Sequence, residues 1–360
     1  MSILAEIIKA EVAAQGAIPF ARFMELALYC PDYGFYEKES DTVGRGGDFY
    51  TSVSVGSLFG GLLAFQFADW LEQMEADQIQ IVEAGAHDGT LAADILCWLS
   101  QNRPHLFPRV QYIIAEPSAR RREWQQKKLQ EFAEKVRWIE TGLEHHEAAF
   151  TGVIFANELL DAMPTHRLGW NALEKKWFEW GVTWEAGRFV WTKLSPTVAL
   201  EHFDWLPSDL LAVLPDGFTS EICPAAESWW ARAAKSLRAG HQLTLDYGLV
   251  AEDFFAPQRP QGTLRAYRRH RSSVDLLADV GEQDLTAHVN FTRIQRAGEA
   301  AGLSTKKLVT QAEFIVGIAQ RFWPAGQTSA NRSAQQIREL QTLLHPEHLG
   351  RAFKVLVQSR

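Results

Sequence analysis

Residues 78–99 read QIQIVEAGAHDGTLAADILCWL, and this stretch decides the fold. The mainly apolar run over 79–82 is typical of a short strand buried inside a sheet. Glu83 ends the run, and Gly85 and Gly89 predict a tight turn before apolar residues recur at helical spacing. Strand, glycine turn and helix together form the first βα unit of a doubly wound sheet. Ligands bind at the carboxyl ends of such strands, where glycine lets the backbone approach them closely.

The glycine turn does not carry the dinucleotide-binding fingerprint. G-x-G-x-x-G requires three glycines, whereas this turn has two, with His87 between them. Two interpretations of the turn remain open at this point. It is either a ligand-binding loop or an ordinary connection between strand and helix that binds no ligand.

The composition indicates a soluble globular protein. The chain has 360 residues, enough for one large domain with additions or for two domains. Apolar residues make up 46% and charged residues 22%, and no run approaches the ~18 apolar residues that a membrane span requires. The net charge of -8 argues against nucleic acid as the main partner and permits a basic one.

The cysteines and the first residues predict a cytoplasmic location. Cys30, Cys97 and Cys223 are widely spaced and odd in number, which fits neither a disulfide framework nor a zinc site. The opening MSILAEIIKAEVAAQG lacks the basic and apolar regions of a signal peptide, and its acidic residues argue against a transit peptide. We therefore expect a protein of the reducing cytoplasm.

A long loop precedes the central stretch. Residues 29–60 hold many glycines and aromatic residues without a helical period, and GRGGDFYTS at 44–52 is their centre. The glycines would allow close approach of the backbone to a ligand, and Asp48, Thr51 and Ser52 could form hydrogen bonds with it. In the alternative interpretation, Thr51 or Ser52 only caps the next helix.

Polar residues also follow two later strands of the predicted sheet. Glu116 ends the strand expected within 109–118, at the place where nucleotide-like ligands have their ribose hydroxyls bound. Asn157, Glu158 and Asp161 follow the fourth predicted strand, in which residues 153–156 are buried. An amide and two acids are costly to bury without partners, so we expect a polar ligand at this edge. The alternative is a capped loop that is exposed to water.

Two long segments interrupt the strand and helix pattern. Residues 170–194 are rich in tryptophan, alternate between apolar and polar positions and contain an EAGR turn, which predicts an inserted β-hairpin. The tryptophans could bind a partner, but the apolar underside of a hairpin is the more common structure. Residues 252–290 are weakly periodic, and a basic cluster at 265–271 reads as a solvated face.

Sequence blocks along nearly the whole chain occur in the order and spacing of one known family. These blocks are GGDFYTS, the E-x-G turn, AEPS, NELLDAMP, LTLDYG, GTLRAYRRH, DLTAHVNF and LGRAFKVLV. In them the chain resembles the MidA-type S-adenosylmethionine (SAM)-dependent methyltransferases, which include the mitochondrial complex I assembly methyltransferase. The resemblance implies a class I, Rossmann-like α/β sheet. Residues 1–75 would form a helical N-terminal extension with the glycine-rich loop, and residues 76–360 the methyltransferase domain, with insertions at about 165–220 and 250–290.

The resemblance also implies the residues of the site. The glycine-aspartate loop beside SAM would consist of Gly46, Gly47, Asp48, Thr51 and Ser52. The motif around the methionine part of SAM would consist of Glu83, Gly85 and Gly89. The acid that binds the ribose would be Glu116. Asn157, Glu158 and Asp161 would line the acceptor side. S-adenosylhomocysteine would be the product. The chain departs from the family at Ser54, where an acid is usual, and at His87, where we expect glycine.

Three functions are compatible with these residues. The first is a SAM-dependent arginine methyltransferase that acts on a partner protein, such as a subunit of a respiratory complex or another assembly. Glu158 and Asp161 would orient the protonated guanidinium, and no metal is required. The second is an inactive assembly factor, which Ser54 and His87 favour. The third is a small-molecule methyltransferase, against which the long loops and the aromatic insertion argue.

Overall fold

The computed structural model describes residues 2–38, 51–146, 149–268, 271–273, 275–323, 333–346 and 349–360. Its largest sheet confirms the predicted α/β class. Across this sheet the strand order is β15 (Ser304–Thr310), β16 (Phe353–Ser359), β10 (Leu237–Leu249), β5 (Phe150–Asn157), β2 (Ile79–Ala84), β3 (Val110–Ala115) and β4 (Val136–Ile139), and β14 (Val289–Asn290) pairs with β10. The strands from β10 to β4 run parallel, and β16 is antiparallel to both of its neighbours.

The strand order reverses direction beside β2. The chain passes from β2 outward to β3 and β4, and then returns to place β5 on the other side of β2. In doubly wound sheets such a switch point opens a crevice at the carboxyl ends of the two strands, where ligands bind. The fold therefore places the residues after β2 and β5 at the entrance of one crevice.

The predicted first βα unit is present. β2 is followed by a turn and by α5 (Thr90–Asn102). Gly85 and Gly89 have φ angles of 76° and 85°, a left-handed conformation that glycine adopts without strain. The two glycines are thus required by the shape of the turn.

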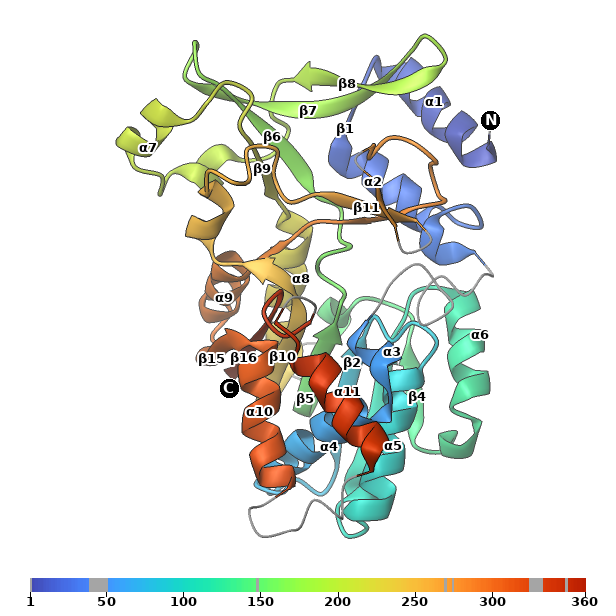
Figure 1. The fold of residues 1–360 in the computed structure, drawn as a ribbon. Coiled ribbons are helices and arrows are strands. Elements are labelled where there is room, and N and C mark those ends of the chain that lie inside the picture. Colours follow the sequence, from blue (N-terminus) through green and yellow to red (C-terminus); the bar gives the residue numbers. More distant parts are fainter. Residues whose placement is uncertain are drawn as a thin grey trace.

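Helices cover both faces of the central sheet (Figure 1). On one face, apolar side chains of the strands form a core with α5, α4 (Ser57–Leu71), α10 (Gln311–Phe322) and α11 (Ala334–Leu344). On the other face lie α8 (Pro224–Ser236) and α9 (Phe291–Ala300). Ile81 faces the first core and Val82 the second, so successive residues of β2 are buried on opposite faces.

The N-terminal helices and the inserted strands form the upper part of the molecule in Figure 1. The elements of this part are α1 (Ile3–Gln15), α2 (Phe20–Tyr29), an antiparallel sheet of β1 (Ile18–Pro19), β7 (Lys176–Glu185), β6 (His166–Asn171) and β9 (Thr219–Ile222) with β8 (Arg188–Leu194) beside β7, and a small sheet of β12 (Arg271–Ser273), β11 (Arg265–Arg268) and β13 (Asp284–Thr286). β1 pairs with β7, so the N-terminal residues and the insertion share one sheet. The division into domains at residue 75 stays a prediction.

The remaining described helices are short. They are α3 (Ser52–Val55), α6 (Ala119–Lys128), α7 (Ser208–Val213) and the 3-10 helices η1 (Phe35–Glu37), η2 (Phe107–Arg109), η3 (Gln130–Phe132), η4 (Leu143–His145), η5 (Leu200–Phe203) and η6 (Ala251–Phe255). Among the residues that the structure describes, no helix is long and apolar enough to cross a membrane.

The hairpin predicted within 170–194 is present, and two further segments differ from the sequence predictions. Residues 170–194 belong to three strands, of which β7 and β8 form the hairpin, with Ala186 and Gly187 at φ 48° and 83° in its turn. The weakly periodic segment 252–290 contains the short strands β11 to β14: β12 pairs with the adjacent β11, whereas β11 with β13 and β14 with β10 pair across longer stretches of sequence. β15 was not predicted, because it is an edge strand in which two exposed lysines interrupt the apolar alternation.

Candidate active site

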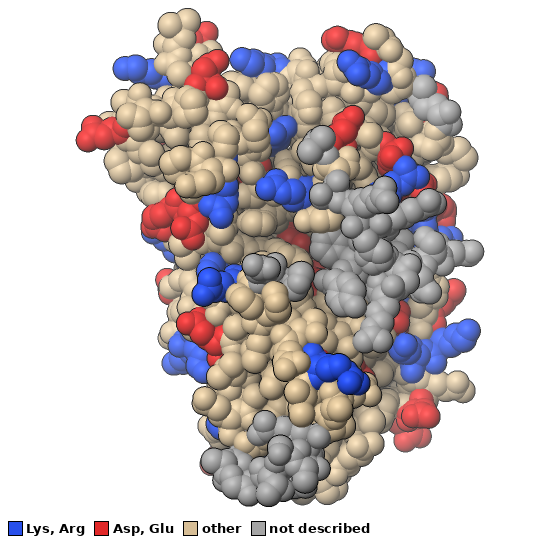
Figure 2. Space-filling model, viewed as in Figure 1, with Lys and Arg blue, Asp and Glu red and all other residues tan. Residues whose placement is uncertain are grey.

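A cavity of about 220 Å³ lies at the switch point, far larger than the space of a single ordered water. Its walls come from η1, α3, the turn after β2, the loop after β5, the first turn of α6 and β13. The cavity thus lies between the carboxyl edge of the central sheet and the upper part. Figure 2 shows acidic side chains inside the hollow between these two parts.

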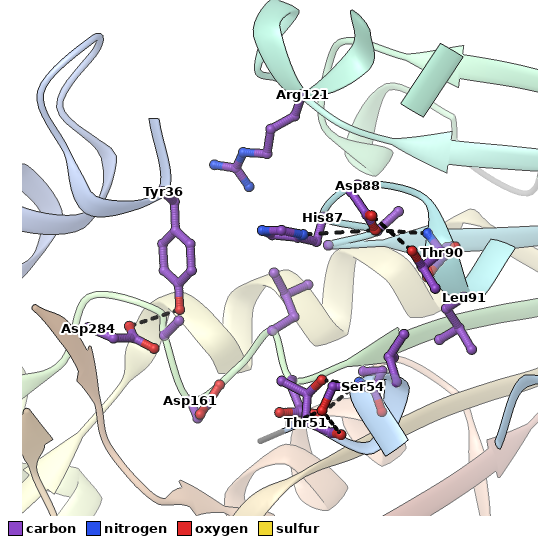
Figure 3. Close-up of a pocket in the computed structure, with 18 of the residues that line it drawn as sticks. Tyr36, Thr51, Ser54, His87, Asp88, Thr90, Leu91, Arg121, Asp161 and Asp284 are labelled. Atoms are coloured by element: carbon purple, nitrogen blue, oxygen red, sulfur yellow. Dashed lines mark hydrogen bonds and ion pairs between the residues drawn. The ribbon is translucent and has the colours of Figure 1, made fainter. Parts of the chain in front are cut away.

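The turn after β2 forms one wall of the cavity. His87 has a φ of 45°, so a residue with a Cβ occupies a left-handed position. Its ring points across the cavity toward Tyr36 (Figure 3). Asp88 fixes the start of α5, because its Oδ1 accepts from the Thr90 amide at 2.9 Å and its Oδ2 from the Thr90 hydroxyl at 2.8 Å. The conformation of the turn is therefore held without the middle glycine.

Glu83 lies below this turn and lines the cavity. It is 2% exposed, and the Tyr112 hydroxyl donates a hydrogen bond of 2.7 Å to its Oε2. Burial raises the pKa of Glu83 to about 8, despite the hydrogen bond from Tyr112. The carboxyl group is thus mainly protonated at neutral pH, and a nearby cation would lower its pKa.

Glu116 is placed behind the cavity wall rather than in it. Its carboxylate accepts from the Ser118 amide at 2.9 Å and from Gln125 Nε2 at 3.3 Å. Arg121 Nη1 lies 3.8 Å away, and the Arg121 side chain itself lines the cavity. Burial raises the pKa of Glu116, although Arg121 opposes this shift. A ligand in the cavity would reach Glu116 past Arg121.

The glycine-rich loop is only partly described. Gly46, Gly47 and Asp48 lie outside the described residues. Thr51 lines the cavity and caps α3: its hydroxyl accepts from the Ser54 amide at 3.1 Å, and the Ser54 hydroxyl accepts from the Thr51 amide at 3.0 Å. Ser54 therefore has a structural task where the family usually has an acid.

Ser52 contributes its backbone rather than its side chain. Its hydroxyl is buried and bonds Gln311 Oε1 at 3.1 Å. Its amide donates a hydrogen bond of 3.1 Å to Glu158 Oε1. The loop before α3 and the end of β5 are thereby connected.

The acids predicted at the end of β5 do come together. Glu158 has a φ of 53°, a strained position of the kind found at functional sites, and its Oε1 also accepts from Asn157 Nδ2 at 3.1 Å. Burial, and then the nearby charge of Asp161, raise the pKa of Glu158 to about 8. Asp161 is 5% exposed, and burial together with Asp246 and Asp284 raises its pKa well above the ordinary value.

Asp246 at the end of β10 belongs to the same group of acids. Its Oδ2 accepts from the amides of Leu159 and Leu160 at 3.2 and 2.8 Å, so it shapes the loop that carries Glu158 and Asp161. Burial raises the pKa of Asp246 to about 7, and burial together with the neighbouring Asp246 raises the pKa of Asp161, so the two carboxyl groups do not ionise readily at the same time. Within the described chain, no lysine or arginine pairs with Glu158, Asp161 or Asp246.

The wall of the site formed by the upper part of the molecule contains residues that no sequence pattern predicted. Tyr36 donates a hydrogen bond of 2.9 Å to Asp284 Oδ1 (Figure 3). The ring of Tyr29 stacks on that of Tyr36, with the ring centroids 5.6 Å apart. Arg121 reaches the same space from α6. Tyr36 and Asp284 come from segments without a clear period, and Tyr29 and Arg121 lie on helices whose local pattern does not indicate a ligand. Asp246 did leave a signal, because it is an acid at the carboxyl end of a buried strand.

A model of a known family matches residues 62–309, and the family is described as "Putative S-adenosyl-L-methionine-dependent methyltransferase". The chain belongs to this family. It is a SAM-dependent methyltransferase of the MidA type, as the sequence blocks predicted. SAM is therefore the cofactor, and the inactive relative considered above is not supported.

Solved structures agree with this assignment. The chain has a TM-score of 0.82 and 32% identity to a Burkholderia thailandensis protein bound to S-adenosyl-homocysteine, with 99% of this chain and 92% of that chain covered. A second structure from the same organism, solved in its native form, gives a TM-score of 0.82 and 31% identity over 99% and 91% of the two chains.

Curated relatives cover most of the chain at lower identity. The protein arginine methyltransferase NDUFAF7 of Xenopus tropicalis is 27% identical, with 97% of this chain and 85% of that protein covered. The human protein of the same name is 25% identical over 95% and 80% of the two chains. Both are named as mitochondrial proteins, which contradicts the cytoplasmic location predicted above. That prediction is wrong because free cysteines indicate a reducing compartment without saying which one.

Proposed function

We propose that the protein transfers the methyl group of SAM to the guanidinium of an arginine in a partner protein. One observation carries the proposal: Glu158, Asp161 and Asp246 are gathered beside the cavity, and no lysine or arginine pairs with their carboxyl groups in the described structure. A buried group of acids without a counter-charge is suited to a cationic ligand. The relatives named protein arginine methyltransferases support the same acceptor.

We place the cofactor on the β2 side of the cavity. Gly85 and Gly89 lie in the turn there, and a Cβ on Gly85 would come within 3.0 Å of Leu159. We assign Glu83 to the ammonium of the methionine part, because a buried carboxyl group that faces the cavity can ionise against a cation. Glu116 would bind the ribose hydroxyls. Thr51 and the Ser52 backbone would lie beside the cofactor.

The acids on the β5 side would bind the acceptor. Bound SAM supplies an electrophilic methyl group, so the protein mainly has to orient the acceptor nitrogen and exclude water. Glu158 and Asp161 would hold the guanidinium by charge-assisted hydrogen bonds and direct one nitrogen toward the β2 side. Asn157 Oδ1 is buried without a partner among the described residues, and can accept a further N–H. The nitrogen that gains the methyl group loses a proton, which the Asp161–Asp246 pair can accept.

Methyl transfer to a defined peptide tests the proposal. The full chain is incubated with methyl-labelled SAM and either an N-acetylated Gly-Arg-Gly amide or the matching Gly-Lys-Gly amide, and mass spectrometry reads the products. We expect the wild type to methylate the arginine peptide but not the lysine peptide. The Glu158→Gln variant should methylate neither peptide. Glu140→Gln is the matched control, because Glu140 follows the sheet strand β4 but its side chain is 69% exposed. Equal labelling of both peptides, or of neither, contradicts an arginine acceptor.

A further inference from the structure

A short segment of the N-terminal part is tied to the cofactor side of the cavity. In η1, Glu37 Oε1 accepts from Arg121 Nη2 at 2.8 Å and Glu37 Oε2 accepts from the Ser118 hydroxyl at 2.9 Å. The Glu37 carbonyl also accepts from Arg120 Nη1 at 2.5 Å. One residue of η1 therefore holds this segment to the first turn of α6.

Arg121 extends this connection to Glu116. Its side chain is only 13% exposed, and its guanidinium lies between Glu37 and Glu116, the carboxylate that we assign to the ribose. Ion pairs that are this well shielded from water are weakly screened, so they hold their partners more firmly than surface pairs do. A single guanidinium thus bridges η1 and the cofactor side of the site.

Tyr36, next to Glu37, reaches the acceptor side. Its hydroxyl donates to Asp284 Oδ1 at 2.9 Å, and Asp284 lines the cavity together with Glu158 and Asp161. Tyr29 stacks on Tyr36 and donates from its own hydroxyl to the Ala162 carbonyl at 2.9 Å. Figure 3 shows Tyr36 and Arg121 facing the same space from opposite elements. The position of the Asp284 carboxylate therefore depends on Tyr36.

We propose that Glu37 and Arg121 are positioning residues for acceptor binding. They hold η1 so that Tyr36 orients Asp284, which acts as a further carboxylate for the guanidinium. Neither Glu37 nor Arg121 touches the reacting atoms; both act through Tyr36. This role rests on the proposed function and deepens it, because it makes the N-terminal segment, which lies outside the matched residues 62–309, part of the acceptor site.

A double-mutant cycle on the full chain tests this role, with the N-acetylated Gly-Arg-Gly amide as acceptor. Glu37→Gln and Tyr36→Phe should each raise the peptide KM about tenfold, with kcat and the Kd for S-adenosylhomocysteine changed less than about twofold. Because both changes disturb one connection, the double variant should raise KM no further than either single variant. Arg121→Lys keeps the charge but cannot bridge both carboxylates, and should also raise KM. Asp32→Asn, which removes the exposed pair with Arg120, is the control and should leave KM unchanged.

The outcomes separate the two proposals. An unchanged peptide KM in Glu37→Gln, or KM changes that multiply in the double variant, overturns the positioning role while arginine transfer by the wild type stands. Loss of S-adenosylhomocysteine binding in Glu37→Gln also overturns it, since Glu37 would then belong to the cofactor site. A wild-type protein that transfers no methyl group to the peptide overturns the proposed acceptor, and the positioning role with it.

Discussion

Replacing Glu158 by glutamine should abolish methyl transfer and at the same time stabilise the fold. Glutamine keeps the oxygen that accepts from Ser52 and Asn157, both at 3.1 Å, and removes only the charge. Removing a charged group that orients the reacting atoms lowers kcat by about a hundredfold or more. The binding of S-adenosylhomocysteine should remain, because Glu158 lies on the acceptor side.

The gain in stability follows from the pKa of Glu158. Its pKa is about 8 in the folded protein, above the value of an unfolded glutamate, so the folded state binds the proton more tightly. Stability from this group is present at low pH and falls as pH rises from about 4.5 to about 8. Glutamine cannot ionise and escapes this loss, which amounts to about 4 kcal/mol at pH 8 and under about 1 kcal/mol at pH 5. The first figure is an upper limit, because Glu158 is half-buried and faces the cavity.

Thermal unfolding at the two pH values measures this difference. At pH 8 the Tm of Glu158→Gln should exceed that of the wild type by up to roughly 5 °C, and at pH 5 the two should nearly coincide. Glu140→Gln should show neither effect. A variant that is less stable than the wild type at pH 8, or one that retains transfer within about tenfold, would refute the reasoning.

Three further predictions concern the cofactor side and the loop after β5. Glycine at position 87 adopts the φ of 45° without strain, and His87→Gly also removes the ring from the cavity. This variant should therefore bind S-adenosylhomocysteine more tightly in a calorimetric titration. Weaker binding would mean that the imidazole contacts the cofactor. Glu83, with a pKa of about 8, should release its proton when the cofactor ammonium binds, so SAM affinity should rise with pH up to about 8 and the binding enthalpy should depend on the buffer. Glu83→Gln should remove both effects. A buffer-independent enthalpy in the wild type would contradict the assignment. In Asp246→Asn one carboxylate oxygen becomes an N–H₂ group that faces either the amides of Leu159 and Leu160 or the amide of Tyr247, and two donors then oppose each other. Transfer should fall at least tenfold with cofactor affinity kept; wild-type kcat would show that Asp246 does not shape the loop.

The fold could be predicted where its signals are local. The strand, turn and helix of 78–102 follow from a buried apolar run, two glycines and a helical period, all within one stretch. Asn157, Glu158 and Asp161 could be assigned to one edge because they directly follow such a strand. β15 could not, because its partner β16 lies far along the chain and its lysines conceal the pattern.

The upper wall of the site could not be predicted from local patterns. Tyr36 and Asp284 are 248 residues apart in sequence, and Ser52 and Glu158 are 106 apart, so only the folded chain brings each pair together. Glu116 illustrates the opposite case. The sequence placed it correctly at the end of a strand but could not show that the neighbouring Arg121, and not Glu116, lines the cavity. Its role toward the ribose stays a prediction.

The most direct test of the account compares arginine with a neutral analogue of the same shape. The wild-type protein, saturated with S-adenosylhomocysteine, is titrated with the N-acetylated Gly-Arg-Gly amide and with the same peptide carrying citrulline, which has no charge. We expect the arginine peptide to bind and the citrulline peptide not to bind, because the acids beside the cavity require a cation. Equal binding of both peptides, or binding of neither, would contradict the account.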